Sequence, residues 1–215
     1  MNYKVPDREA AMRPALCVFC GSNHGKDPAY TDVARRFGAL MAQNGFDLVF
    51  GGGGVGLMGE LARSVREHHA KVTGIIPDFL RHLEPPLQIA SELIITRDMN
   101  ERKSKMFAAA DAFVVLPGGL GTLDELAEAM TGAQLRTHAK PIVFVNTKGF
   151  FDPLLDFFDH IIGHGFASPD IKNLTRVVAT PEEAIALLRG SLRPSAAAGD
   201  APAPPAQARA KHSQK

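Results

Sequence analysis

Short apolar runs alternate with amphipathic stretches along most of this sequence, and that alternation restricts the chain to few folds. The runs have the length of strands, and the stretches between them have the apolar spacing of helices. We expect strands at 15–20, 46–51, 71–76, 92–96, 112–117, 141–146 and 175–180, and helices at 29–45, 57–70, 99–110, 123–135, 151–162 and 181–190. Strands separated by helices predict an α/β fold: a Rossmann-like, doubly wound parallel sheet flanked by helices, in a single domain.

Composition indicates one folded domain with a loose segment at each end. Of the 215 residues, 45% are hydrophobic and 22% are charged, which is ordinary for an α/β domain. We expect the folded domain at 14–190 and a loose N-terminal arm at 1–13. The segment 191–215 is rich in Ala and Pro and has little to bury, so we expect a disordered tail there.

Charge and cysteine content restrict the partners and the compartment. The net charge is +1 with His neutral, so no overall field favours nucleic acid or a membrane surface. Two cysteines are too few for a disulfide framework, and no apolar run approaches the roughly 20 residues of a membrane-spanning helix. We therefore expect a cytoplasmic protein that binds neither nucleic acid nor membrane.

Three of the predicted strands end in glycine-rich loops, at 20–25, 51–59 and 117–122. In a doubly wound sheet, ligands bind at the carboxyl ends of the strands, near the point where the strand order reverses. The loops therefore mark a binding edge. From the first loop, "CGSNHG", we place Gly21 and Ser22 among the predicted substrate-binding residues.

The second loop, "GGGGVGLMG", contains G-x-G-x-x-G at Gly54, Gly56 and Gly59. Asp78 and Glu84 lie at about the distance where a dinucleotide-binding domain carries its ribose-binding acid. An NAD-dependent oxidoreductase is thus an alternative. The fingerprint follows the second strand rather than the first, however, and tight strand-to-helix packing also explains its glycines.

The third loop, "LPGGLGTLDE", is the strongest signal in the sequence. Glycines at 118, 119 and 121 let a ligand approach the backbone, and unpaired N–H groups at a helix start attract an anion. We predict a phosphate-binding loop formed by Gly118, Gly119, Leu120, Gly121 and Thr122. Thr122 and Glu125 also match a T-x-x-E capping box at the helix start, which would explain those two residues but not the three glycines.

A basic segment, "RDMNERKSK" at 97–105, follows another strand end on the same edge of the sheet. Such a segment is usually a solvated helix face. Its position at the carboxyl edge of the sheet would nevertheless let Arg102 reach a ligand held by the glycine loops.

Together these motifs resemble the LOG family (the "lonely guy" cytokinin-activating enzymes). The segments "CGSNHGKDPAY", "GGGGVGLMG", "MNERK" and "PGGLGTLDE" occur in the order and spacing of that family, from about residue 17 to 184. Members of the family are often labelled lysine decarboxylases. This sequence has neither a pyridoxal-lysine context nor the length of the usual decarboxylases.

The resemblance implies a phosphoribohydrolase, which cleaves nucleoside 5′-monophosphates such as AMP and isopentenyl-AMP to free base and ribose 5-phosphate. Arg102 and Glu125 match the catalytic arginine and glutamate of the family. The positions that match substrate-binding residues are Glu84, Lys103, Gly119, Gly121, Thr122 and Thr131. The resemblance also implies a homodimer, and it requires no cofactor and no metal.

The residue types suit this reaction. Cleavage of a glycosidic bond passes through an oxocarbenium-like sugar, which a nearby carboxylate stabilises while it orients or activates water. A phosphate held by the glycine loop would present the anomeric carbon to Glu125. Arg102 could bind the ribose or the base, or support the glutamate.

Two positions depart from the family pattern. The usual "MHERK" has Asn100 in place of His, and the usual "TWAQLG" has Gly132 in place of Trp and ends in Arg136. Neither departure removes the predicted catalytic pair. The loss of a large aromatic residue affects the expected shape of the base pocket and the subunit contacts.

Other motifs have ordinary structural interpretations. Cys17 and Cys20 are three apart in a strand, so we expect core cysteines on opposite faces. His160 and His164 share a helix face with Asp156 at metal-capable spacing, but a polar helix face is the favoured interpretation. The aromatic residues Phe150, Phe151, Phe157 and Phe158 are expected in the core or at a subunit contact.

Two further expectations concern assembly and an alternative function. The helix at 123–135 carries an apolar stripe of Leu126, Ala129, Met130 and Ala133, next to small residues that would let a partner helix approach. The competing class is a binding protein without catalysis, because molybdenum-cofactor carriers resemble this fold and use similar glycine loops. Phosphate binding alone needs no carboxylate, so Arg102 and Glu125 together favour the enzyme.

Overall fold

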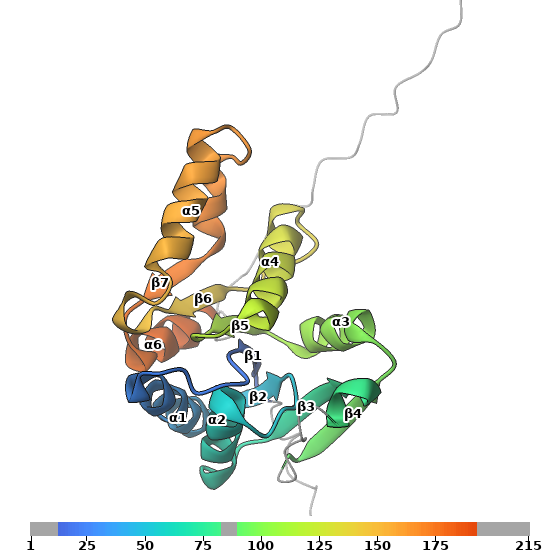
Figure 1. The fold of residues 1–215 in the computed structure, drawn as a ribbon. Coiled ribbons are helices and arrows are strands. Elements are labelled where there is room, and N and C mark those ends of the chain that lie inside the picture. The colour runs from blue at the N-terminus through green and yellow to red at the C-terminus, as the bar shows by residue number, and fades with distance from the viewer. Residues whose placement is uncertain (1–12, 83–89, 193–215) are drawn as a thin grey trace, which may run out of the picture.

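A computed structural model describes residues 13–82 and 90–192 (Figure 1). Of the expected arm at 1–13 and tail at 191–215, residues 1–12 and 193–215 lie outside the described residues, as does Glu84. The strands are β1 (Ala15–Phe19), β2 (Asp47–Phe50), β3 (Val72–Pro77), β4 (Glu92–Thr96), β5 (Ala112–Val115), β6 (Ile142–Val145) and β7 (Arg176–Val178). The helices are α1 (Pro28–Gln43), α2 (Gly56–Glu67), α3 (Met99–Ala109), α4 (Leu120–Gln134), α5 (Asp152–Gly163) and α6 (Pro181–Leu192).

The strands form one seven-stranded parallel sheet in the order β4-β3-β2-β1-β5-β6-β7. This confirms the predicted doubly wound α/β fold. Each expected strand and helix is present, and the bounds differ by a few residues at most. The largest difference that matters for the site is at α4, which begins at Leu120 rather than at 123.

Two hydrophobic layers hold the helices on the sheet. Helices α1, α2 and α6 cover one face and α3, α4 and α5 cover the other (Figure 1). Alternate residues of β1 enter the two layers: Leu16 and Val18 pack in the first, and Cys17 and Phe19 pack in the second. Cys20 lies in the first layer, so the expectation of two core cysteines on opposite faces is confirmed.

The apolar stripe of α4 that we expected at a subunit contact packs on the sheet instead. Leu126, Ala129 and Met130 are buried in the second layer, and Ala133 is partly buried against it. A helix on a doubly wound sheet must bury one face, and these side chains form that face. The stripe therefore gives no evidence for a partner.

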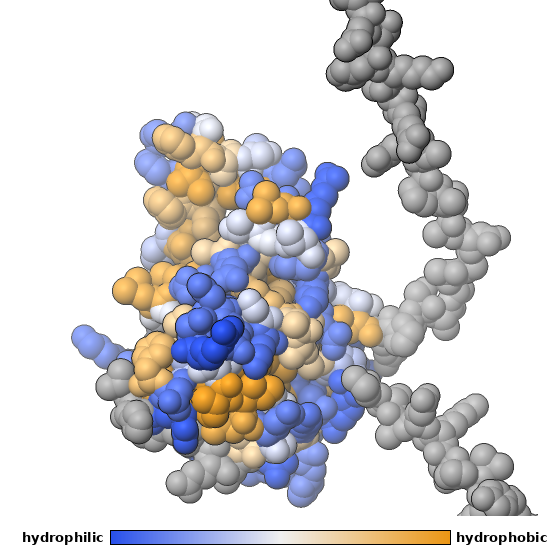
Figure 2. Space-filling view, turned by 90° about the vertical axis from the view of Figure 1, so that its right-hand side faces the viewer, coloured by the Kyte–Doolittle hydropathy of each residue, from blue (hydrophilic) through white to orange (hydrophobic). Residues whose placement is uncertain are grey.

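The edge strand β4 is less covered than the central strands. Its side chains Leu93 and Ile95 are 37% and 39% exposed, and Figure 2 shows apolar side chains gathered at this edge below the charged surface of α3. None of the helices in the described part of the chain is long and apolar enough to cross a membrane.

The strand order reverses between β1 and β5, which pair in register with Phe19 opposite Val115. The loops that follow these two strands therefore leave the sheet side by side. Gly21 N donates to Pro117 O over 3.0 Å and joins them directly. This is the position at which an open α/β sheet binds ligands.

Candidate functional site

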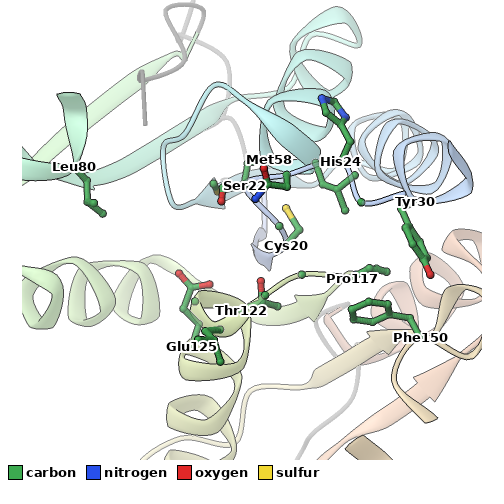
Figure 3. A pocket seen from close by; sticks show the side chains of 18 of the residues that line it. Cys20, Ser22, His24, Tyr30, Met58, Leu80, Pro117, Thr122, Glu125 and Phe150 are labelled. Carbon is green, nitrogen blue, oxygen red and sulfur yellow. The ribbon is translucent and has the colours of Figure 1, made fainter. Parts of the chain in front are cut away.

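A cavity of about 570 Å³ opens above the two joined loops. Most of the predicted site residues line it: Gly21, Ser22, Gly118, Gly119, Leu120, Gly121, Thr122, Arg102 and Glu125. Figure 3 shows Thr122 and Glu125 entering the cavity from the start of α4, with Ser22 and Cys20 across from them. The structure thus brings together residues that are distant in sequence.

Two predicted substrate-binding residues lie elsewhere among the described residues. Thr131 is exposed on α4, six residues beyond the cavity-lining Glu125, and does not line the cavity. Lys103 does not line the cavity either: its Nζ forms ion pairs with Asp124 (3.0 Å) and Glu128 (2.7 Å) on α4. These two carboxylates raise the pKa of Lys103, with Glu128 the larger cause. Lys103 therefore fastens α3 to α4, the two helices that carry Arg102 and Glu125.

The predicted capping box at the start of α4 is wrong. Leu123 N donates to Gly119 O over 3.1 Å, so Gly119 is the N-cap and Thr122 lies inside the helix. Gly119 forms no side-chain cap, and the starts of α2 and α5 have none either, whereas Asp27 and Asp98 cap α1 and α3. The N-cap residue Gly119 has no side chain that could accept from the first N–H groups of α4, and this helix start lines the cavity, as expected of an anion site.

The glycines of the third loop serve different purposes. At Gly118 a Cβ would lie 2.1 Å from Thr122 Oγ1 and 2.9 Å from Gly21 N, so the fold itself needs glycine there. At Gly119 and Gly121 a Cβ would meet nothing within 4 Å. Glycine inside a helix costs about 1 kcal/mol relative to alanine. Packing does not require glycine at 121, and the open space beside this residue belongs to the cavity.

Arg102 and Glu125 form a buried pair at the cavity wall. Each residue is 7% exposed, and Arg102 Nη2 lies 3.7 Å from Glu125 Oε1. The guanidinium also donates from Nε to Ile75 O (3.1 Å) and from Nη2 to Gly51 O (3.2 Å). These carbonyls stand at the carboxyl ends of β3 and β2, so two strands fix the position of Arg102.

Glycine at position 51 is necessary for this arrangement. A Cβ there would lie 1.9 Å from Arg102 Nη2, far inside the contact distance of a carbon and a nitrogen that are not bonded to each other. Any side chain at position 51 would displace the guanidinium and separate it from Glu125. Gly51 begins the second glycine loop, at 51–59. The sequence alone did not indicate that this glycine makes room for Arg102.

The second glycine loop does not form a dinucleotide site. At Gly56 (φ +59°) a Cβ would lie 2.2 Å from the carbonyl carbon of Ser22, and Met58 N donates to Gly21 O over 3.2 Å. The start of α2 is therefore packed against the first loop. Asp78, the proposed ribose-binding acid, pairs with Arg81 at 3.0 Å. The packing interpretation of this G-x-G-x-x-G motif is the correct one.

Several cavity residues were not predicted from the sequence. The apolar wall includes Tyr30, Leu57, Met58, Leu80, Met99 and Phe150, and His24 lies at the rim. Phe150 was expected in the core or at a subunit contact, but it is 37% exposed and faces the cavity. Of the other three phenylalanines, Phe151 is buried, Phe158 packs on the core and Phe157 is 54% exposed.

The departures from the family pattern lie outside the cavity. Asn100 is exposed at the start of α3. Gly132 lies against the turn after α4, where a Cβ would be 2.9 Å from the His138 ring. His138 in turn contacts Ala129 O (2.9 Å) and packs against Phe113. The imidazole of His138 thus fills the space beside Gly132, and position 132 is the one at which the family pattern has tryptophan.

The remaining motifs supply no metal site among the residues that the structure describes. His164 Nδ1 contacts His160 O at 2.9 Å, and the two rings lie 4.1 Å apart. No group of three His, Cys, Asp or Glu side chains in residues 13–82 and 90–192 is arranged to hold a metal ion.

Cys20 lines the cavity, so its protonation state affects what the site can do. Burial raises the pKa of this thiol well above its ordinary value, and the negative charge of Glu125 raises it further. The same two causes raise the pKa of Cys17. Because the thiolate is the nucleophilic form, Cys20 is not a nucleophile at neutral pH.

The chain is similar to known proteins over most of its length. Residues 58–188 match a family model described as "Possible lysine decarboxylase". The chain is 40% identical over 185 residues to the cytokinin riboside 5′-monophosphate phosphoribohydrolase LOG3 of Arabidopsis thaliana, covering 86% of each chain. It is 42% identical over 166 residues to LOG7 of the same plant, covering 77% of this chain and 76% of that one.

Solved structures confirm the fold. The molybdenum cofactor binding protein of Rippkaea orientalis superposes with a TM-score of 0.66 and 23% identity, over 86% of this chain and all of that one. The Moco carrier protein of Chlamydomonas reinhardtii gives a TM-score of 0.64 and 21% identity, over 84% of this chain and 98% of that one. At such identity the likeness concerns the fold alone.

We predict that both thiols are unreactive in the folded protein at pH 8. Ellman's reagent should modify neither Cys17 nor Cys20 within minutes, because burial keeps them protonated and out of reach. Both thiols should react once guanidinium unfolds the chain. Rapid modification of Cys20 in the native protein would contradict this prediction, because it would require an accessible and ionised thiol in the cavity.

Proposed function

This chain belongs to the LOG family of cytokinin riboside 5′-monophosphate phosphoribohydrolases, and from that premise we propose that its cavity hydrolyses N-glycosidic bonds. The substrates are adenosine 5′-monophosphates, including N6-substituted ones, and the products are a free base and ribose 5-phosphate. One observation supports this most strongly: the buried Arg102–Glu125 pair lies within two turns of the start of α4, where the N-cap residue is Gly119.

The phosphate would bind at the start of α4. Its oxygens can accept hydrogen bonds from the N–H groups that follow Gly119, and the positive end of the helix dipole favours the charge. The open space at Gly119 and Gly121 gives the phosphate access to this backbone. The first loop, with Gly21 and Ser22, closes the opposite side.

The sugar would then lie over Glu125, which follows the phosphate site by one turn of α4. The bond between C1′ and the base nitrogen breaks, its electron pair leaves with the base, and positive charge develops on the ribose. The Glu125 carboxylate stabilises that charge. It also accepts a proton from the water whose oxygen bonds to C1′, and this proton replaces the lost bond on the base.

Arg102 would act mainly through Glu125. Its Nε and Nη2 donate to main-chain carbonyls, so the guanidinium is fixed rather than free to follow a substrate. Arg102 Nη2 lies 3.7 Å from Glu125 Oε1, so its positive charge stands beside the carboxylate. The ionised form is the one that stabilises the developing cation and accepts the proton from water.

A non-catalytic carrier is less consistent with this geometry. Binding a phosphate needs hydrogen-bond donors and positive charge, whereas a buried carboxylate one turn away repels the ligand. In an enzyme the same carboxylate has a catalytic use, because positive charge develops on the ribose beside it.

We predict that Glu125→Gln lowers kcat for release of base from AMP and isopentenyl-AMP by about 100-fold or more, while the protein stays folded. Glutamine keeps the size of the side chain but loses the charge and the proton acceptor. Liquid chromatography of the released base measures the rate, and circular dichroism checks the fold. The matched control is Glu67→Gln, which removes the same charge from the exposed end of α2. Turnover of the Glu125 variant near the wild-type rate would mean that the mechanism is wrong.

We also predict that Gly121→Ala raises KM for AMP about tenfold or more without lowering the melting temperature. A methyl group would enter the space left for the phosphate, and one charge-assisted hydrogen bond is worth ~1.5–3 kcal/mol. Gly190→Ala in α6 is the control, because a Cβ there also meets nothing within 4 Å. An unchanged KM, or equal activity on adenosine and AMP, would exclude a phosphate at this loop.

The protein is also expected to work as a homodimer, through a face of α4 other than the one first considered. Leu120, Leu123, Ala127 and Thr131 follow helical spacing on the exposed side. Leu120 is 85% exposed, and Leu135 near the end of the helix is 69% exposed. A partner on this face would shield apolar surface directly beside the cavity, because Leu120 also lines it.

Light scattering should therefore give about twice the 23.1 kDa mass of one chain. Leu123→Glu should shift the mass towards the monomer, whereas Leu93→Glu should not, although these two leucines are equally exposed at 36% and 37%. A wild-type protein that is monomeric and fully active would contradict the proposed dimer.

A further inference from the structure

An aromatic corner closes one end of the cavity. Tyr30 of α1 and Phe150, which follows the short helix at Thr147–Gly149, face each other edge to face with ring centroids 5.6 Å apart. Both rings line the cavity, and Phe150 keeps 37% of its surface exposed. Exposed aromatic faces beside polar loops are typical of sites that bind planar groups.

The corner is held in place by specific contacts on both sides. Gly25 (φ +73°) lies so close to Tyr30 that a Cβ would be 2.9 Å from the ring. Lys148 pairs with Asp27 at 2.5 Å and joins the loop after β6 to the loop after β1. Lys148 adopts a left-handed conformation (φ +54°) that is uncommon for a residue other than glycine.

The loop after β6 is fixed at its other end by Asn146. The side chain of Asn146 accepts from Phe151 N at 2.8 Å and donates to Asp152 at 2.7 Å. Phe150 is therefore presented to the cavity by a loop with little freedom to collapse.

The corner lies away from the proposed reacting centre. In Figure 3, Tyr30 and Phe150 stand at one end of the cavity and Leu80 at the other, with Glu125 on the Leu80 side. The proposed function places C1′ at Glu125 and the phosphate on the loop that begins at Gly118. A nucleotide carries its base at C1′ and its phosphate at C5′, so the base extends towards Leu80. The corner lies beyond the phosphate.

We propose that the Tyr30–Phe150 corner is a second subsite, which binds an aromatic group attached to the far side of the substrate phosphate. The ligands that fit are dinucleotides, in which a second base is joined through a 5′,5′-diphosphate. The inference rests on the proposed function, because it depends on where the reacting sugar and the phosphate lie. His24, at the same rim of the cavity, adds a hydrogen-bonding group beside the second phosphate.

Isothermal titration calorimetry with AMP and with di(adenosine-5′) diphosphate tests this subsite. The titrations use the Glu125→Gln protein, which should not consume either ligand. The dinucleotide should bind about tenfold more tightly than AMP, as one additional base–aromatic stacking contact provides. When Phe150→Ala is combined with Glu125→Gln, that advantage should be lost. The affinity for the dinucleotide divided by the affinity for AMP should then fall about tenfold. Phe157→Ala, which truncates an exposed phenylalanine outside the cavity, should leave the ratio unchanged.

Two results would overturn the second subsite. The dinucleotide could bind no more tightly than AMP, or Phe150→Ala could weaken both ligands equally, which would place the base of AMP itself in the corner. Release of base from AMP by the wild-type protein is measured separately. A protein that releases base but shows no preference for the dinucleotide keeps the proposed function and loses only the subsite.

Discussion

The arrangement of the site depends on one buried cation. A guanidinium removed from water is stable only where several acceptors surround it. Arg102 finds the carbonyls of Ile75 and Gly51 and the carboxylate of Glu125, which come from β3, the end of β2 and α4. Because these groups belong to three separate elements, the position of Arg102 fixes α3 against the sheet and against the helix that carries Glu125. Lys103, one residue further, secures the same two helices from outside the cavity.

The glycines of the site differ in their physical purpose. Gly51 makes room for a protein group, since Arg102 occupies the place of its Cβ. Gly118 allows two loops to touch. Gly119 and Gly121 have open space beside them, so the fold itself does not require glycine there, and both residues line the cavity. Only the last kind leaves room for a ligand in the cavity, and it occurs at a helix start whose N-cap residue has no side chain.

Much of the fold could be predicted from the sequence because strand length and helical spacing are local properties. The strands and helices and the binding edge follow from runs and motifs in the chain. Arg102 and Glu125 were identified through the family resemblance, and contact between them was one of several possibilities for Arg102. The start of α4 could not be placed so well. T-x-x-E suggested a cap at Thr122, but Gly119 adopts the cap conformation instead and draws the helix start to Leu120. Local propensity did not distinguish these two starts.

Other features depend on contacts between distant segments, which no local pattern records. The wall formed by Tyr30 and Phe150 comes from segments joined by the Asp27–Lys148 pair. Lys103 matched a substrate-binding position by sequence, yet the carboxylates of α4 hold it outside the cavity. The apolar stripe on α4 was identified correctly, but whether it meets the sheet or a partner depends on the rotation of the helix.

A double-mutant cycle on Gly51→Ala and Arg102→Ala tests the central claim most directly, with kcat for base release from AMP as the readout. If Gly51 serves to place Arg102 beside Glu125, either change alone should lower kcat strongly. The double variant should then be no slower than the slower single variant, because the second change removes an interaction that is already lost. Losses that multiply in the double variant would contradict this account and would give Gly51 and Arg102 independent roles.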